Sequence, residues 1–251
     1  MSGIALVSLV GTVQAEIKNP ETLVYLTTSN ISSLDPAYIG DTASTYSSLN
    51  VYSRLLDNDG SKISEFVPSL STAVPSLANG LIEELDGGAI RYTYPIRDGV
   101  FAHRVGIKGD DGSISWHLYD DLSEGDLSKI EPGYGQITAE DARYSLMRAI
   151  LQGESWMANA VTEMITSGEY TNIEKWAAGL AGVENFEDVD AAGQAAVHAA
   201  LAEKIRVEGN NLIVTLNKSF PATLGIMALP FSTSIIDMEW AIDQGSWPDT
   251  A

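Results

Sequence analysis

The stretch from Ala89 to Phe101 constrains the fold of this chain most strongly, because it reads as a half-buried strand. Its large apolar side chains stand at every second position, namely Ile90, Tyr92, Tyr94 and Ile96. This period of two predicts a strand with one face in the core. Pro95 has no N–H to donate to a neighbouring strand, so we expect a sheet edge or a bulge at this residue.

A helix with a strong start signal follows at residues 137–150. Thr138 is the expected N-cap, and Asp141, three residues later, can accept a hydrogen bond from the backbone of Thr138 to complete a capping box. The apolar stripe of this helix consists of Ala142, Leu146, Ala149 and Ile150. Arg143 and Arg148 are expected on the solvent-facing side.

Further elements follow from shorter patterns. The β-forming run 22–28 predicts a buried strand, and 67–74 predicts a short helix. A helix at 42–55 is expected to turn Tyr46, Leu49, Tyr52 and the following Leu56 inward. Helices are predicted at 155–166, 169–180, 189–204, 220–229 and 238–244. A hairpin is predicted at 205–216, with its turn around Gly209.

Five short motifs, taken in order, resemble one protein family. They are Leu34-Asp35-Pro36, Pro68-Ser69-Leu70, the strand segment from Arg91 to Phe101, Thr138-Ala139-Glu140-Asp141, and Ser234-Ile235-Ile236-Asp237. In this order they resemble the family 5 extracellular solute-binding proteins, the peptide, nickel and oligosaccharide receptors of ATP-driven (ABC) importers. The resemblance implies an α/β fold of the periplasmic-binding-protein type II class, in its large peptide-binding form.

Members of that family have two lobes around a cleft, and the resemblance implies that this chain holds only part of them. The implied division is 1–15 signal peptide, 16–50 start of lobe I, 51–171 an extra subdomain, and 172–251 the continuation of lobe I up to the crossover. Lobe II is then absent. The stretch 104–136, rich in Gly, Asp and Ser, departs from the family pattern as an inserted loop, and a small hairpin is expected at 114–118.

The charge balance excludes some partners. The chain has 14 Lys and Arg residues against 34 Asp and Glu residues, for a net charge of −20. Nucleic acids and anionic membrane surfaces require clustered basic residues, so neither is an expected partner. The chain has no cysteine, which excludes disulfides, thiolate metal sites and a cysteine nucleophile.

The N-terminus indicates export. Residues 3–13 are an apolar run, and residues 13–15 place small side chains at both positions that determine signal-peptide cleavage. The run is too short for a membrane-spanning helix. The alternative is a buried N-terminal strand. We therefore predict a periplasmic or extracellular protein. We also expect it to be a monomer.

Ligand-contacting residues are nominated by the family resemblance alone. In that family the loop after the first strand lines the cleft, which here nominates Thr28, Ser29 and Asn30. An aromatic residue after the Thr138 helix often faces the ligand, and Trp156 holds that position. The alternative for Trp156 is a core aromatic residue of its own helix. The implied ligand is a peptide, or else an oligosaccharide or nickel, and the implied protein partner is the membrane permease of an importer.

No catalytic, cofactor or metal motif is present, so no enzyme, cofactor or metal site is expected. Adjacent acids such as Glu140 and Asp141 point about 100° apart on a helix and are explained by capping. The Asp57-to-Gly60 run lacks the later ligands of a calcium loop and reads as a turn. Two other classes stay open: an extracellular carbohydrate-active or peptide hydrolase that uses the acidic residues, and an adhesion or assembly module that uses the inserted loop.

Overall fold

The computed structural model describes residues 21, 29–153, 156–230 and 233–250. The predicted signal peptide, the predicted strand at 22–28 and the candidate Thr28 lie outside these residues. Within the described part, no helix combines the length and the apolar character needed to cross a membrane.

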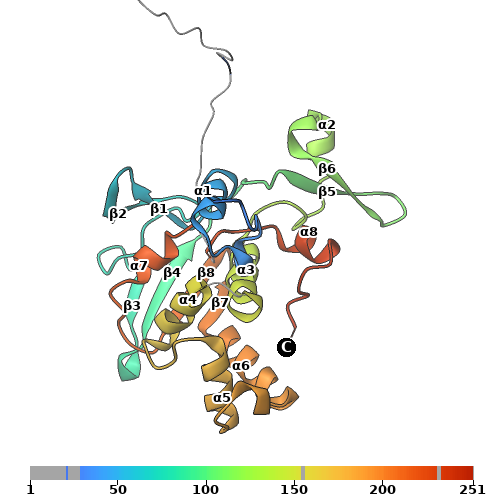
Figure 1. Ribbon diagram of the computed structural model, residues 1–251. Coiled ribbons are helices and arrows are strands. Elements are labelled where there is room, and N and C mark those ends of the chain that lie inside the picture. The colour runs from blue at the N-terminus through green and yellow to red at the C-terminus, as the bar shows by residue number, and fades with distance from the viewer. Residues whose placement is uncertain (1–20, 22–28, 154–155, 231–232, 251) are drawn as a thin grey trace, which may run out of the picture.

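The centre of the molecule is an antiparallel sheet of four strands in the order β3-β4-β8-β7 (Figure 1). The strands are β3 (Ile82–Glu84), β4 (Ile90–Pro95), β8 (Asn211–Leu216) and β7 (Ile205–Glu208). β7 and β8 form the predicted hairpin, whose turn contains Gly209 at a φ of 64°. A positive φ of this kind is favourable for glycine, which has no Cβ.

The alternating strand is confirmed as β4, with Ile90, Tyr92 and Tyr94 buried. β4 lies between β3 and β8, so the expectation that this strand forms a sheet edge is wrong. Thr93 donates its N–H to Leu81 on the β3 side, and Ile96 donates to Asn210 on the β8 side. The nitrogen of Pro95 therefore faces the β3 side at a level before the first residue of β3, Ile82, which pairs with Tyr92. The sheet thus loses no hydrogen bond to β3 at Pro95.

Helices cover the sheet and its flank. α3 (Ala139–Gln152) packs on β7 and β8, and α4 (Trp156–Thr166) packs on β8 and on α3. α5 (Ile173–Ala181) and α6 (Ala191–Lys204) pack against each other at the lower end in Figure 1. The long apolar side chains of α3, among them Leu146 and Ile150, are buried in the common core as predicted.

Two small hairpins lie outside the sheet. β1 (Leu56–Asp59) pairs with β2 (Lys62–Pro68), and the turn between them, at Gly60, confirms the predicted turn. The predicted helix at 67–74 is wrong. Val67 precedes a proline, which disfavours helical backbone, and it pairs with Asp57 as part of β2.

The inserted stretch contains the second hairpin, of β5 (Arg104–Lys108) and β6 (Ile114–Leu118), as expected. It is followed by the short α2 (Glu124–Leu127), and the stretch then returns along β5. Gly135, at a φ of 97°, lies so close to Val105 that a Cβ would stand 2.6 Å from its Cα. Trp116 donates to the Asp243 carboxylate at 2.8 Å, which fastens the hairpin to α8 (Met238–Asp243).

The N-terminal helix is α1 (Thr42–Val51), and the predicted inward face is wrong for Tyr46 and Leu49, whereas Leu56 beyond the helix is buried as predicted. Tyr46 is 51% exposed and Leu49 is 39% exposed. The buried face carries small side chains instead, namely Ala43, Ser44 and Ser48. Small residues allow close approach of the neighbouring backbone, and Ser48 donates its hydroxyl to the Pro230 carbonyl at 2.9 Å.

Short elements complete the described chain. They are the 3-10 turns Pro36–Tyr38, Asp86–Gly88, Tyr119–Asp121 and Phe186–Asp188, and the helix α7 (Thr223–Met227). Asp35 caps the first of these turns by accepting from the N–H of Ala37. α7 is shorter than the helix predicted at 220–229.

Candidate functional site

One cavity of about 320 Å³ lies where several connecting segments converge. We call it the motif cavity. Its lining consists of residues 51–53 at the end of α1, Leu70, residues 100–104 after β4, Ile137, residues 235–237 and Trp240. Loops held by a sheet and helices are common places for binding sites.

Backbone hydrogen bonds hold these walls together. Ile235 donates to the carbonyl of Ser53 at 2.9 Å, and Ile137 donates to that of Val100 at 2.9 Å. Ala102 donates to Gly135 at 2.7 Å, which ties the base of the insertion to the same wall. The cavity is therefore formed before any ligand arrives, which lowers the entropic cost of binding.

The chemistry of the lining is mainly apolar. Leu70, Ile137 and Ile235 supply buried aliphatic surface, and Phe101 and Trp240 supply aromatic surface. The charged or titratable side chains in the lining are those of Tyr52, His103, Arg104 and Asp237. A mostly apolar cavity with a few polar groups is typical of sites for small organic ligands.

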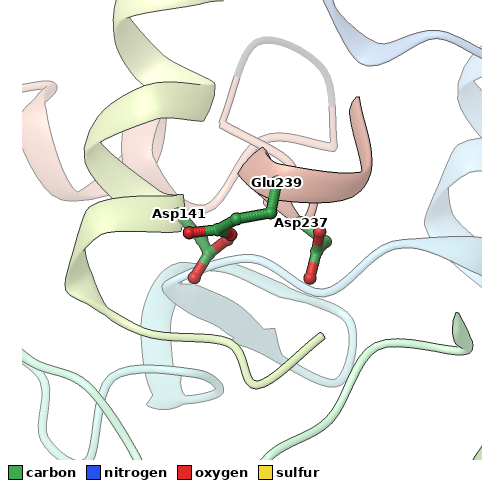
Figure 2. Close-up of side chains that lie close together, drawn as sticks. All are labelled: Asp141, Asp237 and Glu239. Atoms are coloured by element: carbon green, nitrogen blue, oxygen red, sulfur yellow. The ribbon is translucent and has the colours of Figure 1, made fainter. Parts of the chain in front are cut away.

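A group of three carboxylates, Asp141, Asp237 and Glu239, lies beside the cavity (Figure 2). One oxygen from each lies within 4.8 Å of the others. We call it the carboxylate cluster. Asp141 belongs to the first turn of α3, Asp237 is the N-cap of α8, and Glu239 belongs to the first turn of α8. The starts of the two helices thus meet here, and helix N-termini favour negative charge.

Backbone donors satisfy part of the carboxylate cluster. Asp141 accepts from the N–H of Thr138 at 2.8 Å, in the predicted capping box, and from the N–H of Met238 at 2.8 Å. Asp237 accepts from the N–H of Trp240 at 2.5 Å. Asp237 Oδ2 and Glu239 Oε2 are buried without a hydrogen-bond partner.

The surroundings of these acids favour their neutral forms. Burial, together with the charge of Asp141, raises the pKa of Asp237 to about 7. The same two causes raise the pKa of Glu239 to about 7. Burial also raises the pKa of Asp141, against the hydrogen bonds that it accepts. Like charges in a poorly solvated place cannot all ionise cheaply.

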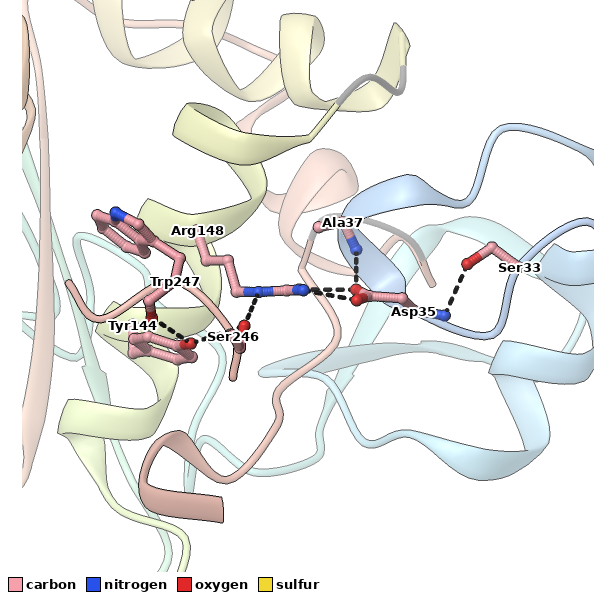
Figure 3. Close-up of polar contacts among 7 residues, drawn as sticks. All are labelled: Ser33, Asp35, Ala37, Tyr144, Arg148, Ser246 and Trp247. Carbon is pink, nitrogen blue, oxygen red and sulfur yellow. Dashed lines mark hydrogen bonds and ion pairs between the residues drawn. The ribbon is translucent and has the colours of Figure 1, made fainter. Parts of the chain in front are cut away.

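An oppositely charged pair lies two turns further along α3 (Figure 3). Arg148 binds both carboxylate oxygens of Asp35, at 2.6 and 2.5 Å, and donates from Nε to Ser246 at 2.7 Å. The prediction that Arg148 faces solvent is wrong, because it is 7% exposed. The guanidinium group binds the carboxylate through two parallel hydrogen bonds, which offset the free-energy cost of burying the two charges.

Arg148 also sets the protonation of its partner. Burial opposes ionisation of Asp35, but the hydrogen bonds and charge of Arg148 outweigh it and lower the pKa of Asp35. The neighbouring Tyr144 donates to the carbonyl of Trp247 at 2.8 Å, so α3 holds the C-terminal segment as well as the N-terminal one (Figure 3).

Comparison with known proteins gives matches in structure but not in sequence. No protein-family model and no curated protein matches the chain. Solved structures similar to it include solute-binding proteins. A periplasmic oligopeptide-binding protein of Borrelia burgdorferi is 18% identical with a TM-score of 0.49, and the match covers 85% of this chain and 31% of that one.

Two other solved structures give similar values. The substrate-binding domain of an oligopeptide ABC transporter from Bacillus anthracis is 14% identical, with a TM-score of 0.49, over 86% of this chain and 30% of that one. A binding protein from A. tumefaciens in complex with agropinic acid is 16% identical, with a TM-score of 0.46, over 88% and 29%. This chain thus spans about 30% of such proteins. They are of the class that the sequence motifs resemble.

The nominated ligand residues lie apart from the motif cavity. Ser29 and Asn30 are in an exposed connection, and neither belongs to the cavity lining. Trp156 is the first residue of α4 and is 61% exposed, so the alternative of a core aromatic residue is wrong. Its assignment to the ligand stays a prediction, as do those of Ser29, Asn30 and Thr28.

Sequence reasoning missed the carboxylate cluster. Asp141 was explained by capping alone, and Asp237 was read only as part of a family motif. Almost a hundred residues separate them along the chain, and no residue spacing connects them. The available signal was that an N-cap aspartate and a first-turn glutamate both open the helix predicted at 238–244.

Proposed function

We propose that this chain is part of an extracytoplasmic solute-binding receptor of an ATP-driven importer, and that its ligand is a peptide. The motif cavity is the part of the binding site that this chain supplies. The remainder of the site belongs to a second lobe outside this chain. Closure of the two lobes on the ligand, with the closed state stabilised by binding, is the proposed mechanism.

One observation carries the proposal: three of the five family-like motifs line one cavity, and the residue that precedes a fourth lines it as well. Leu70 ends the second motif, and residues 100–101 end the third. Ile137 directly precedes the fourth, and residues 235–237 form most of the fifth. These segments are far apart in sequence, so their convergence on one cavity is what a shared binding role requires.

The first motif does not line the cavity, but it contacts the helix that follows the fourth motif's start. Asp35 belongs to Leu34-Asp35-Pro36 and makes the two-pronged ion pair with Arg148 on α3. The start of the chain is thereby fixed to the helix that begins with the fourth motif. Ser29 and Asn30, which precede this motif, are proposed as ligand contacts together with Thr28 and Trp156.

The lining favours a peptide over the other two ligand classes. Nickel requires nitrogen or oxygen ligands in a compact set, and oligosaccharides need many polar partners. The aliphatic residues Leu70, Ile137 and Ile235, with the ring of Phe101, suit an apolar side chain of a peptide. His103 and Arg104 at the base of the insertion supply groups for its polar backbone.

The other parts of the proposal follow from the family resemblance. The protein is exported, acts as a monomer and delivers its ligand to a membrane permease. In the proposed division, residues 16–50 and 172–251 belong to lobe I, and 51–171 is the extra subdomain. The inserted loop 104–136 then forms a rim, because its first residue, Arg104, lines the cavity.

The test is a thermal-shift and calorimetry screen of the full-length protein with peptides, oligosaccharides and nickel. Peptides should stabilise the protein by about 2.7 kcal/mol at a hundredfold excess over Kd. Ala102→Phe, which fills the cavity, should weaken peptide affinity at least tenfold. The matched control Ala196→Phe, on the exposed side of α6, should leave affinity unchanged.

Two outcomes would count against the proposal. One is the absence of stabilisation by any of the three ligand classes when no solute has co-purified. The other is peptide binding that Ala102→Phe and Ala196→Phe affect equally, because the cavity would then have no part in it.

A hydrolase is the second candidate, favoured by acids of raised pKa beside a cavity. Its geometry is unsuitable, since the two carboxyl groups of a glycosidase stand about 5–5.5 Å or about 6.5–9.5 Å apart across the substrate. The oxygens of the carboxylate cluster lie within 4.8 Å of one another, and Asp141 and Asp237 are buried. Turnover of chromogenic glycosides or peptides, lost in Glu239→Gln, would restore this candidate.

An adhesion module remains the third candidate. In that case the inserted loop carries the interaction, and the cavity is incidental. Deletion of 104–136 with full retention of peptide binding, together with loss of a macromolecular partner, would favour it.

A further inference from the structure

We propose that the carboxylate cluster of Asp141, Asp237 and Glu239 is a binding site for a divalent cation of the size of Ca²⁺. The inference goes beyond solute binding and departs from the expectation, stated above, of no metal site. Its starting point is geometric: three carboxylates from the starts of α3 and α8 converge, with one oxygen of each within 4.8 Å of the others (Figure 2).

A second observation points to a missing partner. Asp237 is 5% exposed, and its Oδ2 has no hydrogen-bond partner of good geometry; the nearby backbone N–H of Gly135 favours its charged form without carrying a charge. The Oε2 of Glu239 is also buried without a partner. A buried carboxylate oxygen without a partner costs free energy, so such oxygens are normally hydrogen-bonded or bound to a metal.

The ion pairs of the described residues do not neutralise this charge. Arg143 pairs with Asp249, Arg148 pairs with Asp35, and none of the ion pairs among the described residues includes a member of the carboxylate cluster. The donors that reach Asp141 and Asp237 are backbone N–H groups and the Thr138 hydroxyl. These donors carry no full positive charge. A cation would supply it.

The ligand set selects the kind of cation. Carboxylate oxygens are the preferred ligands of hard divalent cations, and an oxygen of each acid within 4.8 Å of the others can share one ion. Mg²⁺ keeps several of its waters and is rarely held by protein carboxylates alone, so a site of three carboxylates favours Ca²⁺.

Such a site would join two parts of the molecule. Asp141 is fixed in α3 by its capping box, while Asp237 and Glu239 belong to the segment that continues into Trp240. Asp237 and Trp240 both line the motif cavity. Cation binding would therefore hold one cavity wall against α3.

The test uses the full-length protein, freed of metal with EDTA and then titrated with CaCl₂ without any solute. We expect a saturable calorimetric heat and a melting temperature that rises with CaCl₂ concentration, with a response to MgCl₂ at least tenfold weaker. In Asp237→Asn with Glu239→Gln, Ca²⁺ binding should be lost, while the metal-free melting temperature should rise. The rise shows that the variant folds and that repulsion has been removed.

The matched control is Asp120→Asn with Asp121→Asn, two exposed acids in the inserted loop, which should bind Ca²⁺ as the unmodified protein does. Absence of Ca²⁺ binding, or equal binding by the Asp237/Glu239 variant, would overturn the proposal. Because no solute is present, either result leaves the receptor function untouched, and failure of peptide binding would in turn leave the cation site standing.

Discussion

Two charged groups on one helix, Arg148 with Asp35 and Asp141 with its two acidic neighbours, show opposite solutions to buried charge. Arg148 is 7% exposed, but its guanidinium group donates to both carboxylate oxygens of Asp35 and to the hydroxyl of Ser246. In the carboxylate cluster the nearby charges have the same sign, and two buried oxygens have no hydrogen-bond partner. The first group is a structural clamp, and the second is a group of buried acids whose charges repel one another.

The comparison has a direct consequence for mutagenesis. Removal of a charge from the clamp should destabilise the protein, because it leaves the other charge poorly compensated. Removal of a charge from the carboxylate cluster should stabilise the metal-free protein. The two substitutions should therefore change the free energy of unfolding in opposite directions, which a general loss of stability on mutation would not explain.

The largest expected effect is at the clamp. Arg148→Met keeps much of the side-chain volume but removes the ion pair with Asp35 and the bond to Ser246. We expect a loss of about 2–4 kcal/mol in the free energy of unfolding, measured by urea denaturation. The exposed pair of Arg206 with Glu208 is the control, and Arg206→Met should cost less than about 1 kcal/mol. Equal effects of the two substitutions would remove the distinction between clamp and surface pair.

The second effect is a pH dependence that comes from the carboxylate cluster. The pKa values of Asp237 and Glu239 are about 7 in the folded protein, above the ordinary value near 4 of the unfolded chain. Between these values the folded state binds more protons, so its stability falls as the pH rises from about 4 to about 7. In EDTA, the unfolding free energy should therefore fall across this range.

The amide variant provides the comparison for that experiment. Asp237→Asn with Glu239→Gln should flatten the fall and gain on the order of 1–3 kcal/mol at pH 8, since one pKa unit corresponds to about 1.4 kcal/mol. Asparagine can still cap α8, so the helix start is kept. A variant that is less stable than the unmodified protein at pH 8 in EDTA would show that repulsion among these carboxylates does not destabilise the folded state.

Asp35 should show the opposite dependence on pH. Its pKa lies below its ordinary value in the folded protein. The stability that it contributes is therefore present above the unfolded pKa near 4 and is lost as the pH falls through the folded value.

The smallest effect is expected at the capping box, which shares Asp141 with the carboxylate cluster. Thr138→Ala removes the hydroxyl that accepts from Glu140 and donates to Asp141. The loss should be about 1 kcal/mol by thermal or urea unfolding. Thr138→Ser keeps the hydroxyl and should cost only a few tenths of that amount. If alanine and serine behave alike, the hydroxyl makes no contribution to the helix start.

The sequence predicted helix starts, strands and turns correctly where residues close together in the chain determine them. The capping box of Thr138 and Asp141, the alternation of Ile90 to Ile96 and the Gly209 turn all depend on neighbours in sequence, and all three are confirmed.

Long-range partners explain the errors. Arg148 was placed in solvent because its partner, Asp35, is over a hundred residues away in sequence. The face of α1 was misassigned because apolar content favoured Tyr46 and Leu49, whereas the neighbouring backbone at Pro230 needs the small Ser48. The carboxylate cluster could not be predicted for the same reason, since the meeting of α3 and α8 decides it.

The most direct test of the account is a crystal structure of the full-length protein with its bound solute. We predict solute density in the motif cavity, in contact with Leu70, Phe101 and Trp240, and closed over by the second lobe. Density for the solute at a place remote from these three residues would contradict the proposed binding role of this chain.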